Sequence, residues 1–350
     1  MKVLITGGTG FVGSHAAEFF VNEGYDVVIF DNLMRARILG KKEASTSYNL
    51  KYLRERYRKI RFINGDIRNF KQIRKICKDV DIIIHTAAQT AVTSSLQNPR
   101  LDFEINTVGT FNVLEAARLS KKRPTLVFCS TNKVYGNNVN KIKVIEKEKR
   151  YVFADKRFEY GIPESFSIDL CEHTPYGASK LAADIYVQDY AERNEINAAV
   201  FRMSCIYGTR QFGVEDQGWV AWFCIATMLG KQITIYGDGK QVRDVLYVDD
   251  LINAFHRFIE KAAKIEHAVY NMGGGRENTI SLLELLDMLE KMSGKKPNIS
   301  FGDWRAADQK VYISDIRKAM KELKWKPRIK PKEGVKRLLE WVEENKRIFQ

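Results

Sequence analysis

Cysteine and histidine are scarce in this sequence, and no long apolar run occurs in it. The five cysteines include no C-x-x-C pair, and their odd number suits a reducing compartment better than a secreted, disulfide-stabilised domain. The five histidines are scattered and form no cluster with cysteine, so we expect no metal site. No apolar stretch approaches the roughly 18 residues that cross a bilayer. The first residues, MKVLITGGTGFVG, place glycines where a signal peptide needs its apolar run, so we expect a cytoplasmic protein.

The composition is that of a folded protein with a basic surface. Hydrophobic residues make up 45% of the 350 positions, which supports a full core in one large domain and a smaller lobe. A formal charge of +14 raises the question of nucleic-acid binding. Lys and Arg, however, alternate with acidic residues along helical stretches such as IRKAMKELKWKPRIKPK. This distribution favours a solvated surface and a phosphate-binding cleft, and we expect no nucleic-acid partner.

Short β-branched runs alternate with helical patterns in the first half of the chain, which is typical of a parallel sheet. Most of these runs are continuously apolar, as strands buried on both faces should be. From about residue 207 helices dominate, which indicates a lobe over the carboxyl edge of the sheet, where ligands bind in such folds. The sequence therefore predicts an α/β fold of the Rossmann type. Its doubly wound parallel sheet is expected over 1–206 and a smaller C-terminal substrate-binding lobe over 207–350, with some chain crossing between them.

These patterns predict seven strands and eight longer helices. The strands are Lys2–Thr6, Asp26–Phe30, Ile60–Asn64, Ile82–Thr86, Thr125–Ser130, Ala198–Met203 and Thr234–Tyr236. The helices are Ser14–Glu23, Phe70–Lys78, Ile105–Ser120, Lys180–Asn194, Gly218–Leu229, Val248–Lys261, Ser281–Met292 and Pro331–Asn345. The charged stretch 137–172 is expected to be a loop or insertion near the functional site.

A glycine-rich turn follows the first expected strand. The spacing Gly7-x-x-Gly10-x-x-Gly13, or Gly8-x-Gly10-x-x-Gly13, lets the backbone approach a pyrophosphate while the next helix offers its N-terminal N–H groups. Asp31 ends the second strand, 18 positions past Gly13. A carboxylate there accepts hydrogen bonds from both adenosine ribose hydroxyls and repels a 2′-phosphate, which favours NAD over NADP.

A tyrosine and a lysine are spaced to share one face of a helix. Tyr176 and Lys180 lie four residues apart in HTPYGASKLAADIY. The Lys180 ammonium, together with an oxidised nicotinamide, is expected to lower the pKa of the Tyr176 phenol, so that it accepts a proton from a hydroxyl as hydride leaves. Ser130 and Thr131 end a strand in CSTNKVYG, and a Thr131 hydroxyl there can bond the reacting oxygen. We expect Thr131, Tyr176 and Lys180 to be catalytic.

With these motifs assembled, the chain resembles the extended short-chain dehydrogenase/reductases, the family of nucleotide-sugar epimerases, dehydratases and decarboxylases. The resemblance runs nearly end to end through TGGTGFVG, GDIR, HTAAQ, INTVGT, STNKVYG, YGASK, GDGKQVRDVLYVDD and NMGGG. It implies that the NAD site of residues 1–206 is formed by Gly7, Gly10, Phe11, Val12, Gly13, Asp31, Asn32, Asp66, Ile67, Ala87, Ala88, Gln89, Asn106, Ser130, Tyr176, Lys180 and Met203.

The same resemblance implies a nucleotide-sugar site that involves the C-terminal lobe. Arg243 and Arg305 resemble phosphate partners, and Asp308 resembles an acceptor for the substrate ribose. Cys205 stands where many relatives carry Asn, so a phosphate contact at this point has a weaker donor. The full set expected to bind substrate is Gln89, Thr131, Cys205, Gln217, Trp219, Tyr236, Arg243, Arg305 and Asp308.

The residues after Thr131 indicate the type of reaction. Dehydratases of this family carry an Asp-Glu pair there, whereas this chain has Asn132 and Lys133, so the acid and base for elimination are missing. Redox chemistry that ends in inversion of a ring carbon remains. The segment RQFGVEDQGWVAWF is similar to that of epimerases that invert C2 of CDP-linked 3,6-dideoxyhexoses, which makes a CDP-linked deoxyhexose the preferred substrate. Gln217 and Trp219 are expected to meet the base or sugar, and Trp222 to lie in the apolar stripe of a helix.

Other interpretations stay open from the sequence alone. A 4-epimerase acting on a UDP-sugar would use the same catalytic residues, and spacing does not distinguish C2 from C4 or cytidine from uridine and guanosine. A non-catalytic NAD-sensing or nucleic-acid-binding module on the same fold would be expected to lack at least one of them. The family resemblance also suggests a homodimer or homotetramer, with the apolar faces of Ile105–Ser120 and Lys180–Asn194 as candidate contacts.

Overall fold

The computed structural model describes residues 1–35, 44–305 and 308–349. The chain forms two compact units, and each is assembled from three separate segments. The first unit comprises Met1–Val134, Thr174–Arg202 and Ile252–Tyr270. The second comprises Tyr135–His173, Met203–Leu251 and Asn271–Gln350.

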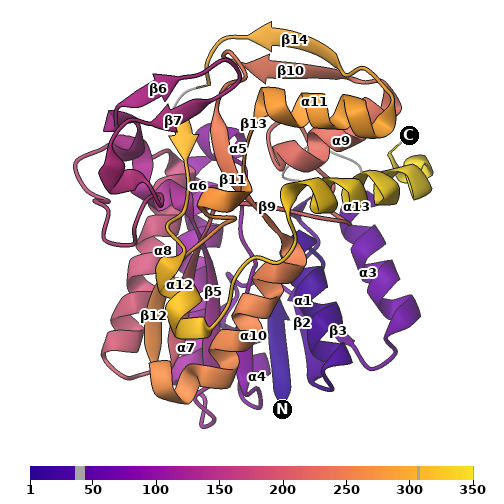
Figure 1. The fold of residues 1–350 in the computed structure, drawn as a ribbon. Coiled ribbons are helices and arrows are strands. Elements are labelled where there is room, and N and C mark those ends of the chain that lie inside the picture. Colours follow the sequence, from indigo (N-terminus) through magenta and orange to yellow (C-terminus); the bar gives the residue numbers. More distant parts are fainter. Residues whose placement is uncertain (36–43, 306–307, 350) are drawn as a thin grey trace. The chain divides into compact units, whose positions relative to one another are not determined.

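A seven-stranded sheet forms the centre of the first unit (Figure 1). Its order is β12–β8–β5–β4–β1–β2–β3, and the pairings that join β5, β4, β1, β2 and β3 are parallel. The order reverses between β1 and β4, which makes their carboxyl ends the switch point of a doubly wound sheet. The predicted fold class is therefore confirmed. The strands are β1 (Lys2–Thr6), β2 (Asp26–Asp31), β3 (Arg61–Asn64), β4 (Ile82–His85), β5 (Thr125–Thr131), β8 (Ala198–Met203) and β12 (His267–Met272).

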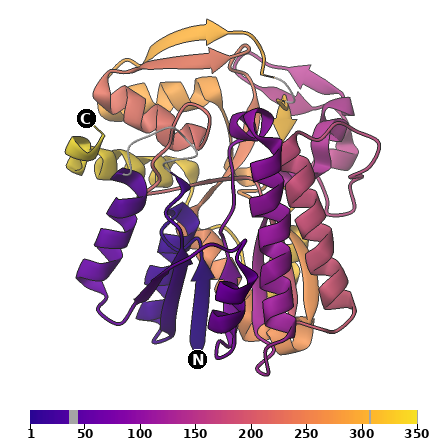
Figure 2. The same ribbon diagram turned by 180° about the vertical axis from the view of Figure 1, so that it is seen from behind.

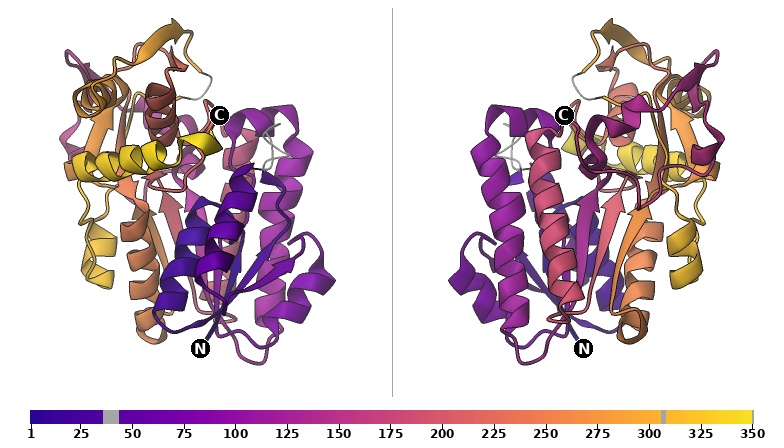
Figure 3. Two further views of the ribbon diagram at one scale, coloured as in Figure 1. Left: turned by 90° about the vertical axis from the view of Figure 1, so that its right-hand side faces the viewer. Right: turned by 90° about the vertical axis from the view of Figure 1, so that its left-hand side faces the viewer.

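Helices cover both faces of this sheet, as the edge-on views show (Figure 3). Alternate strand residues point to opposite faces. Leu4, Phe128 and Val200 belong to one buried cluster, which also holds side chains of α4 (Phe70–Cys77), α7 (Gly109–Arg118) and α8 (Pro175–Glu192). On the other face, the Phe201 ring packs against Phe255 of α10 (Val248–Ile265), with ring centroids 4.9 Å apart.

A buried ion pair joins α8 to β8 within the first unit. Arg202 and Asp184 are 4% and 0% exposed, and the Arg202 Nε lies 3.0 Å from an Asp184 carboxylate oxygen. A second guanidinium nitrogen donates to the other oxygen at 3.1 Å, so the pair is bidentate. Ser130 and Gln188 also donate to the same carboxylate. These hydrogen bonds replace the hydration that the Asp184 carboxylate loses on burial.

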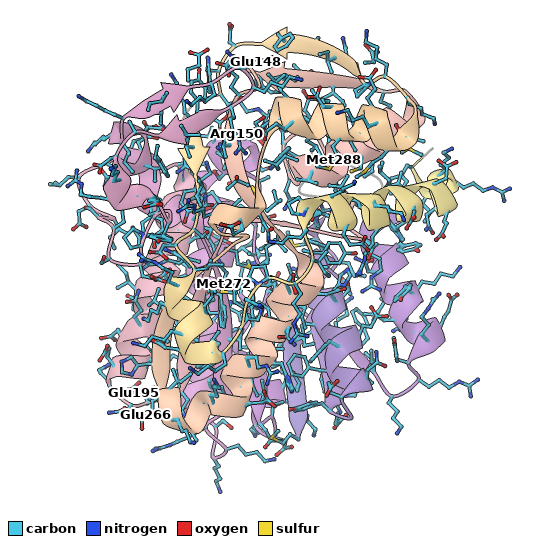
Figure 4. The ribbon with its side chains drawn as sticks, in the orientation of Figure 1. Glu148, Arg150, Glu195, Glu266, Met272 and Met288 are labelled. Carbon is cyan, nitrogen blue, oxygen red and sulfur yellow. The ribbon has the colours of Figure 1, made fainter. Side chains whose placement is uncertain are left out.

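Among the described residues, the second unit contains three smaller sheets and three longer helices, α9 (Trp219–Leu229), α11 (Leu282–Ser293) and α13 (Pro331–Glu344). β10 (Gln232–Tyr236) and β14 (Asn298–Gly302) pair in parallel, and β6 (Val144–Glu146) and β7 (Tyr151–Phe153) pair in the antiparallel sense. β11 (Val242–Tyr247) lies between β13 (Thr279–Ser281) and β15 (Val311–Tyr312) and also pairs with β9 (Cys205–Tyr207). Helix α11 begins with a capping box in which Ser281 and Glu284 satisfy each other's backbone N–H groups. Glu284 also receives a hydrogen bond from Arg150, which lies beside α11 (Figure 4).

The remaining elements divide between the two units. The first unit also holds α1 (Phe11–Asn22), α3 (Ala44–Arg56), α5 (Val92–Gln97), α6 (Pro99–Phe103) and the π-helix η1 (Glu104–Val108). Helix η2 (Asn132–Lys141) begins in the last residues of the first unit and continues into the second. The second unit also holds β6 (Val144–Glu146), β7 (Tyr151–Phe153), η3 (Lys156–Phe158), β9 (Cys205–Tyr207), α9 (Trp219–Leu229), β10 (Gln232–Tyr236), β11 (Val242–Tyr247), η4 (Arg276–Asn278), β13 (Thr279–Ser281), α11 (Leu282–Ser293), β14 (Asn298–Gly302), β15 (Val311–Tyr312), α12 (Arg317–Leu323), α13 (Pro331–Glu344) and η5 (Lys346–Ile348).

The boundary between the units differs from the expected division at residue 206. Segment 252–270 belongs to the first unit because α10 and β12 complete its sheet and cover Phe201. Segment 135–173, which includes the stretch 137–172 expected to be a loop or insertion, belongs to the second unit and contains β6, β7, most of the 3₁₀ helix η2 and the 3₁₀ helix η3. No helix in the part of the chain that the structure describes is long and apolar enough to cross a membrane.

Replacing Arg202 with methionine is expected to lower the free energy of unfolding by about 3–5 kcal/mol, because the buried Asp184 carboxylate would lose its cation. Urea titration of the purified protein measures this loss. Arg257→Met is the matched control, since Arg257 forms an exposed pair with Glu260 and its removal should change stability by no more than about 0.5 kcal/mol. Equal effects of the two substitutions would contradict the prediction.

Candidate active site

The turn between β1 and α1 requires glycine at two positions. Gly7 has a φ of +69°, and a Cβ there would lie 2.6 Å from the backbone nitrogen of Ala87. A Cβ on Gly13 would lie 2.3 Å from the Gly7 carbonyl oxygen. The Gly7 N–H donates to the Phe30 carbonyl at 2.9 Å, and the Gly10 N–H donates to the Gly7 carbonyl at 3.0 Å. The result is a tight backbone turn that delivers the chain to the start of α1.

The first turn of α1 is suited to an anion. Its N-cap, Gly10, has no side chain to accept from the helix, and no acidic residue lies in the first turn. The N–H groups of Phe11, Val12 and Gly13 have no partner within the helix, and the first intrahelical bond runs from the Ser14 N–H to the Gly10 carbonyl. These donors and the helix dipole fit the pyrophosphate of a dinucleotide.

The Asp31 carboxylate is anchored where β2 ends. One oxygen accepts from the Thr9 N–H at 3.0 Å and the Thr9 hydroxyl at 2.7 Å, and the other accepts from the Leu33 N–H at 2.8 Å. Leu33 has a φ of +57°, which turns the chain back toward the carboxylate. A carboxylate has about four acceptor positions and three are used here, so Asp31 keeps capacity for about one further donor, such as a ribose hydroxyl.

Three more residues predicted to bind the cofactor lie together beside β3. Asn32 donates to Asp66 at 3.0 Å, and Arg68 forms an ion pair with the same carboxylate at 2.7 Å. Burial raises the pKa of Asp66, but the hydrogen bonds from Arg68 outweigh it and hold the pKa below its ordinary value. Ile67 is buried, and a Cβ on Gly109 would lie 2.5 Å from its Cδ1.

Helix α8 begins directly before Tyr176. The Thr174 hydroxyl caps the helix by accepting from the Gly177 N–H at 3.3 Å, and Pro175 occupies the first helical position, where its missing N–H costs nothing. The Tyr176 N–H donates to the Ser95 hydroxyl of α5 at 3.1 Å. The backbone of Tyr176 is therefore held by an element distant in sequence.

Lys180 lies one turn after Tyr176 and is 2% exposed. Its Nζ donates to the Cys129 carbonyl of β5 at 2.7 Å and lies 4.2 Å from the centroid of the Phe128 ring. Burial lowers the pKa of Lys180 to about 8. The structure thus places the cation expected from the YGASK motif inside the first unit, at the end of β5.

Thr131 contacts Tyr176. Their hydrogen bond lowers the pKa of the Tyr176 phenol, but burial has the larger effect and raises this pKa to about 12. The Lys180 ammonium donates to Cys129, and the lowering of this pKa expected from Lys180 together with an oxidised nicotinamide stays a prediction. The Thr131 hydroxyl oxygen also lies 3.4 Å from the Asn132 amide oxygen and accepts from the Lys133 N–H at 3.3 Å.

A histidine that we did not single out from the sequence lies behind Lys180. His85 ends β4, is 1% exposed and stacks on the Phe128 ring, with centroids 5.7 Å apart. Burial, and then the charge of Lys180, lower the pKa of His85 to about 3. The ring is therefore neutral at physiological pH.

Its neighbours define which ring nitrogen carries the proton. The Thr110 hydroxyl donates to the Asn106 carbonyl at 2.6 Å, so it accepts from His85 Nε2 at 3.0 Å. His85 Nδ1 then accepts from the Thr6 hydroxyl at 2.6 Å. This chain of bonds connects β1 and β4 to the π-helix, a distortion that often marks functional sites.

The other residues predicted for the cofactor site fall into two groups. Ala87 and Ala88 follow β4 and are half-buried, and Gln89 is buried beside Asn106. The Ser130 hydroxyl donates to Asp184 at 2.6 Å. Met203 lies in the second unit, apart in sequence from the others. These assignments remain predictions.

The second unit holds a tryptophan–cysteine contact. Trp219 begins α9, and its indole Nε1 donates to Cys205 Sγ at 3.3 Å. Cys205 was expected to make a weak phosphate contact; the structure instead makes it an acceptor for the indole. The Gln217 backbone pairs in both directions with Val214 at 2.9 Å, and Trp222 is half-buried.

The two arginines predicted to bind phosphate have acidic partners. Arg243 pairs with Asp308 at 2.6 Å, so two predicted substrate residues contact each other. Arg305 pairs with Asp216 at 3.1 Å, and its guanidinium carbon lies 3.9 Å from the centroid of the Tyr236 ring. Both cations are therefore held in place by residues of the same unit.

Four buried polar residues in contact with the predicted site were not identified as functional from the sequence: His85, Ser95, Asp102 and Ser179. His85 had a signal, since a polar residue ends the apolar run IIIH. Ser179 lies inside the YGASK motif. Ser95 and Asp102 had none, because the contacts that join them to α8, with Tyr176 and Ser179, span 81 and 77 positions of the sequence.

Comparisons with known proteins agree with this geometry. Residues 3–273 match the model of a family described as the NAD dependent epimerase/dehydratase family. A CDP-paratose 2-epimerase of Salmonella typhi is 40% identical over 349 residues, which cover 98% of this chain and 99% of that protein. A UDP-glucuronate 4-epimerase of Thermodesulfobacterium geofontis is 31% identical, with 98% and 96% covered. The structure of a UDP-glucuronic acid 4-epimerase of Bacillus cereus with UDP-glucuronic acid and NAD has a TM-score of 0.80 at 28% identity, covering 99% of this chain and 100% of that one.

Replacing His85 with glutamine is expected to flatten the dependence of stability on pH. The imidazole ordinarily has a pKa of 6.5, whereas burial lowers the pKa of His85 to about 3. Between these values the unfolded chain binds a proton that the folded chain does not, so this contribution is present above pH 6.5 and lost as the pH falls toward 3. At about pH 5 the wild type should have lost roughly 2 kcal/mol through this group.

Urea unfolding of the wild type and His85→Gln near neutral pH and near pH 5 measures this difference. His267→Gln is the control, because His267 is at the surface beside Glu192. Parallel pH curves for the wild type and His85→Gln would show that the imidazole is not held neutral.

Proposed function

The chain belongs to the NAD dependent epimerase/dehydratase family, and we propose that it inverts C2 of a CDP-linked 3,6-dideoxyhexose, the CDP-paratose 2-epimerase reaction. The expected family and the expected cofactor, NAD, are confirmed by this membership. The observation that carries the choice of substrate is the 40% identity to the Salmonella typhi enzyme over nearly the whole of both chains. A putative UDP-glucose 4-epimerase of Methanocaldococcus jannaschii is 32% identical over a similar length, and the UDP-glucuronate 4-epimerase is 31% identical.

The first unit would hold the cofactor with residues that fit it. The α1 N-terminus would bind the pyrophosphate, and Asp31 would accept from the adenosine ribose. A bound oxidised nicotinamide would supply a reversible hydride acceptor and a positive charge that favours the Tyr176 phenolate. Lys180, already fixed by Cys129, would contribute a second positive charge.

The proton would move through Tyr176 and Thr131. The sugar hydroxyl donates its proton to the Tyr176 oxygen as its carbon loses hydride, which gives a keto sugar. The Thr131 hydroxyl contacts both Tyr176 and Asn132. It would therefore form a hydrogen bond to the reacting oxygen of the sugar while the charge on that oxygen changes. After the keto sugar has rotated to present its other face, Tyr176 would return the proton while hydride adds to that face.

Elimination is disfavoured by what surrounds Thr131. Asn132 and Lys133 supply no carboxylate there. The nearby Asp102 carboxylate is buried and engaged by three hydrogen-bond donors, so it does not serve as an acid or base for substrate. Redox without loss of water is the chemistry these residues support.

The second unit would supply the sugar-nucleotide contacts. Arg243 and Arg305 are paired with Asp308 and Asp216, and a diphosphate would compete with these carboxylates for the guanidinium groups. Trp219, fixed by its bond to Cys205, offers a flat ring to a base or sugar. Gln217 lies at the tight turn immediately before α9.

Incubation of the purified protein with CDP-paratose and, separately, with UDP-glucose tests the proposal, with the products analysed by NMR. We expect conversion of the CDP-sugar to its C2 epimer, and loss of at least about 100-fold in kcat on Tyr176→Phe, which removes the proton acceptor. Conversion of the UDP-sugar alone would favour the 4-epimerase instead. Unchanged turnover by Tyr176→Phe would refute the assigned role of the tyrosine.

We also propose that two copies associate through α7 and α8, which lie side by side (Figure 2). Large apolar side chains are exposed on these helices and on the adjoining η1 and α6, and the Phe111 and Tyr186 rings contact each other. Such a patch is typical of an isologous contact, where two helices of each copy form a bundle. The exposed residues are Phe103, Val108, Phe111, Ile185 and Tyr186.

The double substitution Phe111→Glu and Tyr186→Glu is expected to convert a dimer or tetramer to a smaller species, because it places four charges in each symmetric contact. Light scattering after size-exclusion chromatography measures the mass. Phe301→Glu is the control, since Phe301 is exposed in the other unit and should leave the mass unchanged. A monomeric wild type would end this proposal.

A further inference from the structure

Asp102 is a buried carboxylate that forms no direct ion pair in the part of the chain that the structure describes. It lies in α6, is 1% exposed, and forms no ion pair with any Lys or Arg among the described residues. Its hydrogen bonds come from Ser179 at 2.5 Å, Gln89 at 2.8 Å and Asn106 at 3.2 Å. A buried charge is costly unless fully hydrogen-bonded, so these three donors are a condition for its presence.

The three donors belong to three different parts of the proposed cofactor site. Ser179 lies in α8 and directly precedes Lys180, Gln89 lies in the segment after β4, and Asn106 lies in the π-helix η1. The Asn106 side chain also pairs with both backbone groups of Gln89, at 2.9 and 3.0 Å. Gln89 in turn bonds both backbone groups of Ala91.

The cluster therefore joins two segments that would touch the cofactor and the reacting sugar. One is the segment 87–91 that follows β4, and the other is the first turn of α8 with Tyr176 and Lys180. Asn106 donates to the Ser179 hydroxyl at 3.1 Å, which closes a ring of bonds around the carboxylate. No other carboxylate in the described structure bonds all three of these elements.

We propose that Asp102 is a positioning residue, whose buried carboxylate holds the Tyr176–Lys180 turn of α8 in register with the segment that follows β4. This inference rests on the proposed roles of Tyr176 and Lys180. A displacement of a catalytic group by about 1 Å can cost about 100-fold in rate, so a polar cluster that fixes this register acts on kcat without touching the substrate.

The charge of Asp102 acts in the same region as its hydrogen bonds. It stabilises the Lys180 ammonium and opposes ionisation of Tyr176, so it raises the pKa of both groups. Burial raises the pKa of Asp102 itself, and the bonds from Ser179, Gln89 and Asn106 oppose that shift. A neutral side chain of the same shape would lose the charge and reverse the polarity of at least one of these bonds.

The variant Asp102→Asn tests the proposal, with Asp189→Asn as the control. Asp189 lies in α8, the helix that carries Ser179, but is exposed and paired with Arg193. We expect kcat of Asp102→Asn to fall by about 10- to 100-fold while KM changes by less than about threefold, because the diphosphate contacts are assigned to other residues. The control should keep kcat within about twofold. The substrate is whichever of CDP-paratose and UDP-glucose the wild type converts.

Ser179→Ala, a milder variant, removes one donor from the same carboxylate. It should lower kcat about fivefold, and Asp102→Asn combined with Ser179→Ala should be no slower than Asp102→Asn alone, since both act through one bond. Independent, multiplying effects of the two changes would overturn the proposal. If Asp102→Asn does not fold, an unchanged kcat of Ser179→Ala would also overturn it.

Amide hydrogen exchange gives a readout that needs no substrate. Exchange in Asp102→Asn should become at least tenfold faster at Gln89, Ala91 and the Tyr176–Lys180 turn, and should remain unchanged in β1 and α1. Faster exchange with an unchanged kcat would make the cluster merely structural and the inference wrong. A wild type that converts neither sugar would refute the proposed function, while unchanged exchange at these amides would separately refute the role of Asp102.

Discussion

An ammonium group enclosed in the first unit constrains the residues around it. Removing Lys180 from water costs several kcal/mol unless other groups replace its hydration. The Cys129 carbonyl and the face of Phe128 do so directly, and the charges of Asp102 and Asp184 support the ammonium. The same cation requires a neutral neighbour behind Phe128, which explains why His85 is built into a chain of hydroxyl partners. Burial of the Lys180 ammonium thus accounts for both the neutral state of the His85 ring and the tautomer of that ring.

The regular elements of the fold were predictable because they depend on local patterns. β1 matches the expected Lys2–Thr6, and α13 differs from the expected Pro331–Asn345 by one residue. Apolar strands and Pro-initiated helices carry their own boundaries. The helix expected over Ile105–Ser120 begins instead with a π-helical turn, because Asn106 and Thr110 bond to distant residues that no local pattern reveals.

The same distinction between local patterns and contacts with distant residues applies to the site. Glycine spacing and the Tyr176–Lys180 pair are local patterns, and the structure places the glycines in a tight turn and buries Tyr176 and Lys180 in α8. The direction of the Tyr176 pKa was not predictable, because burial depends on the whole fold. Likewise, the substitution of Cys205 looked like a weakened donor, whereas its partner is an indole fourteen residues away.

The way the chain divides between its units governs the order in which they mature. The chain leaves the first unit after Val134, returns at Thr174, leaves again after Arg202 and returns for Ile252–Tyr270. Phe201 meets Phe255 and Tyr270 only when that last segment exists. During translation Phe201 therefore stays without these aromatic partners until residues 252–270 have also been made, so the first unit completes its core only after most of the chain exists.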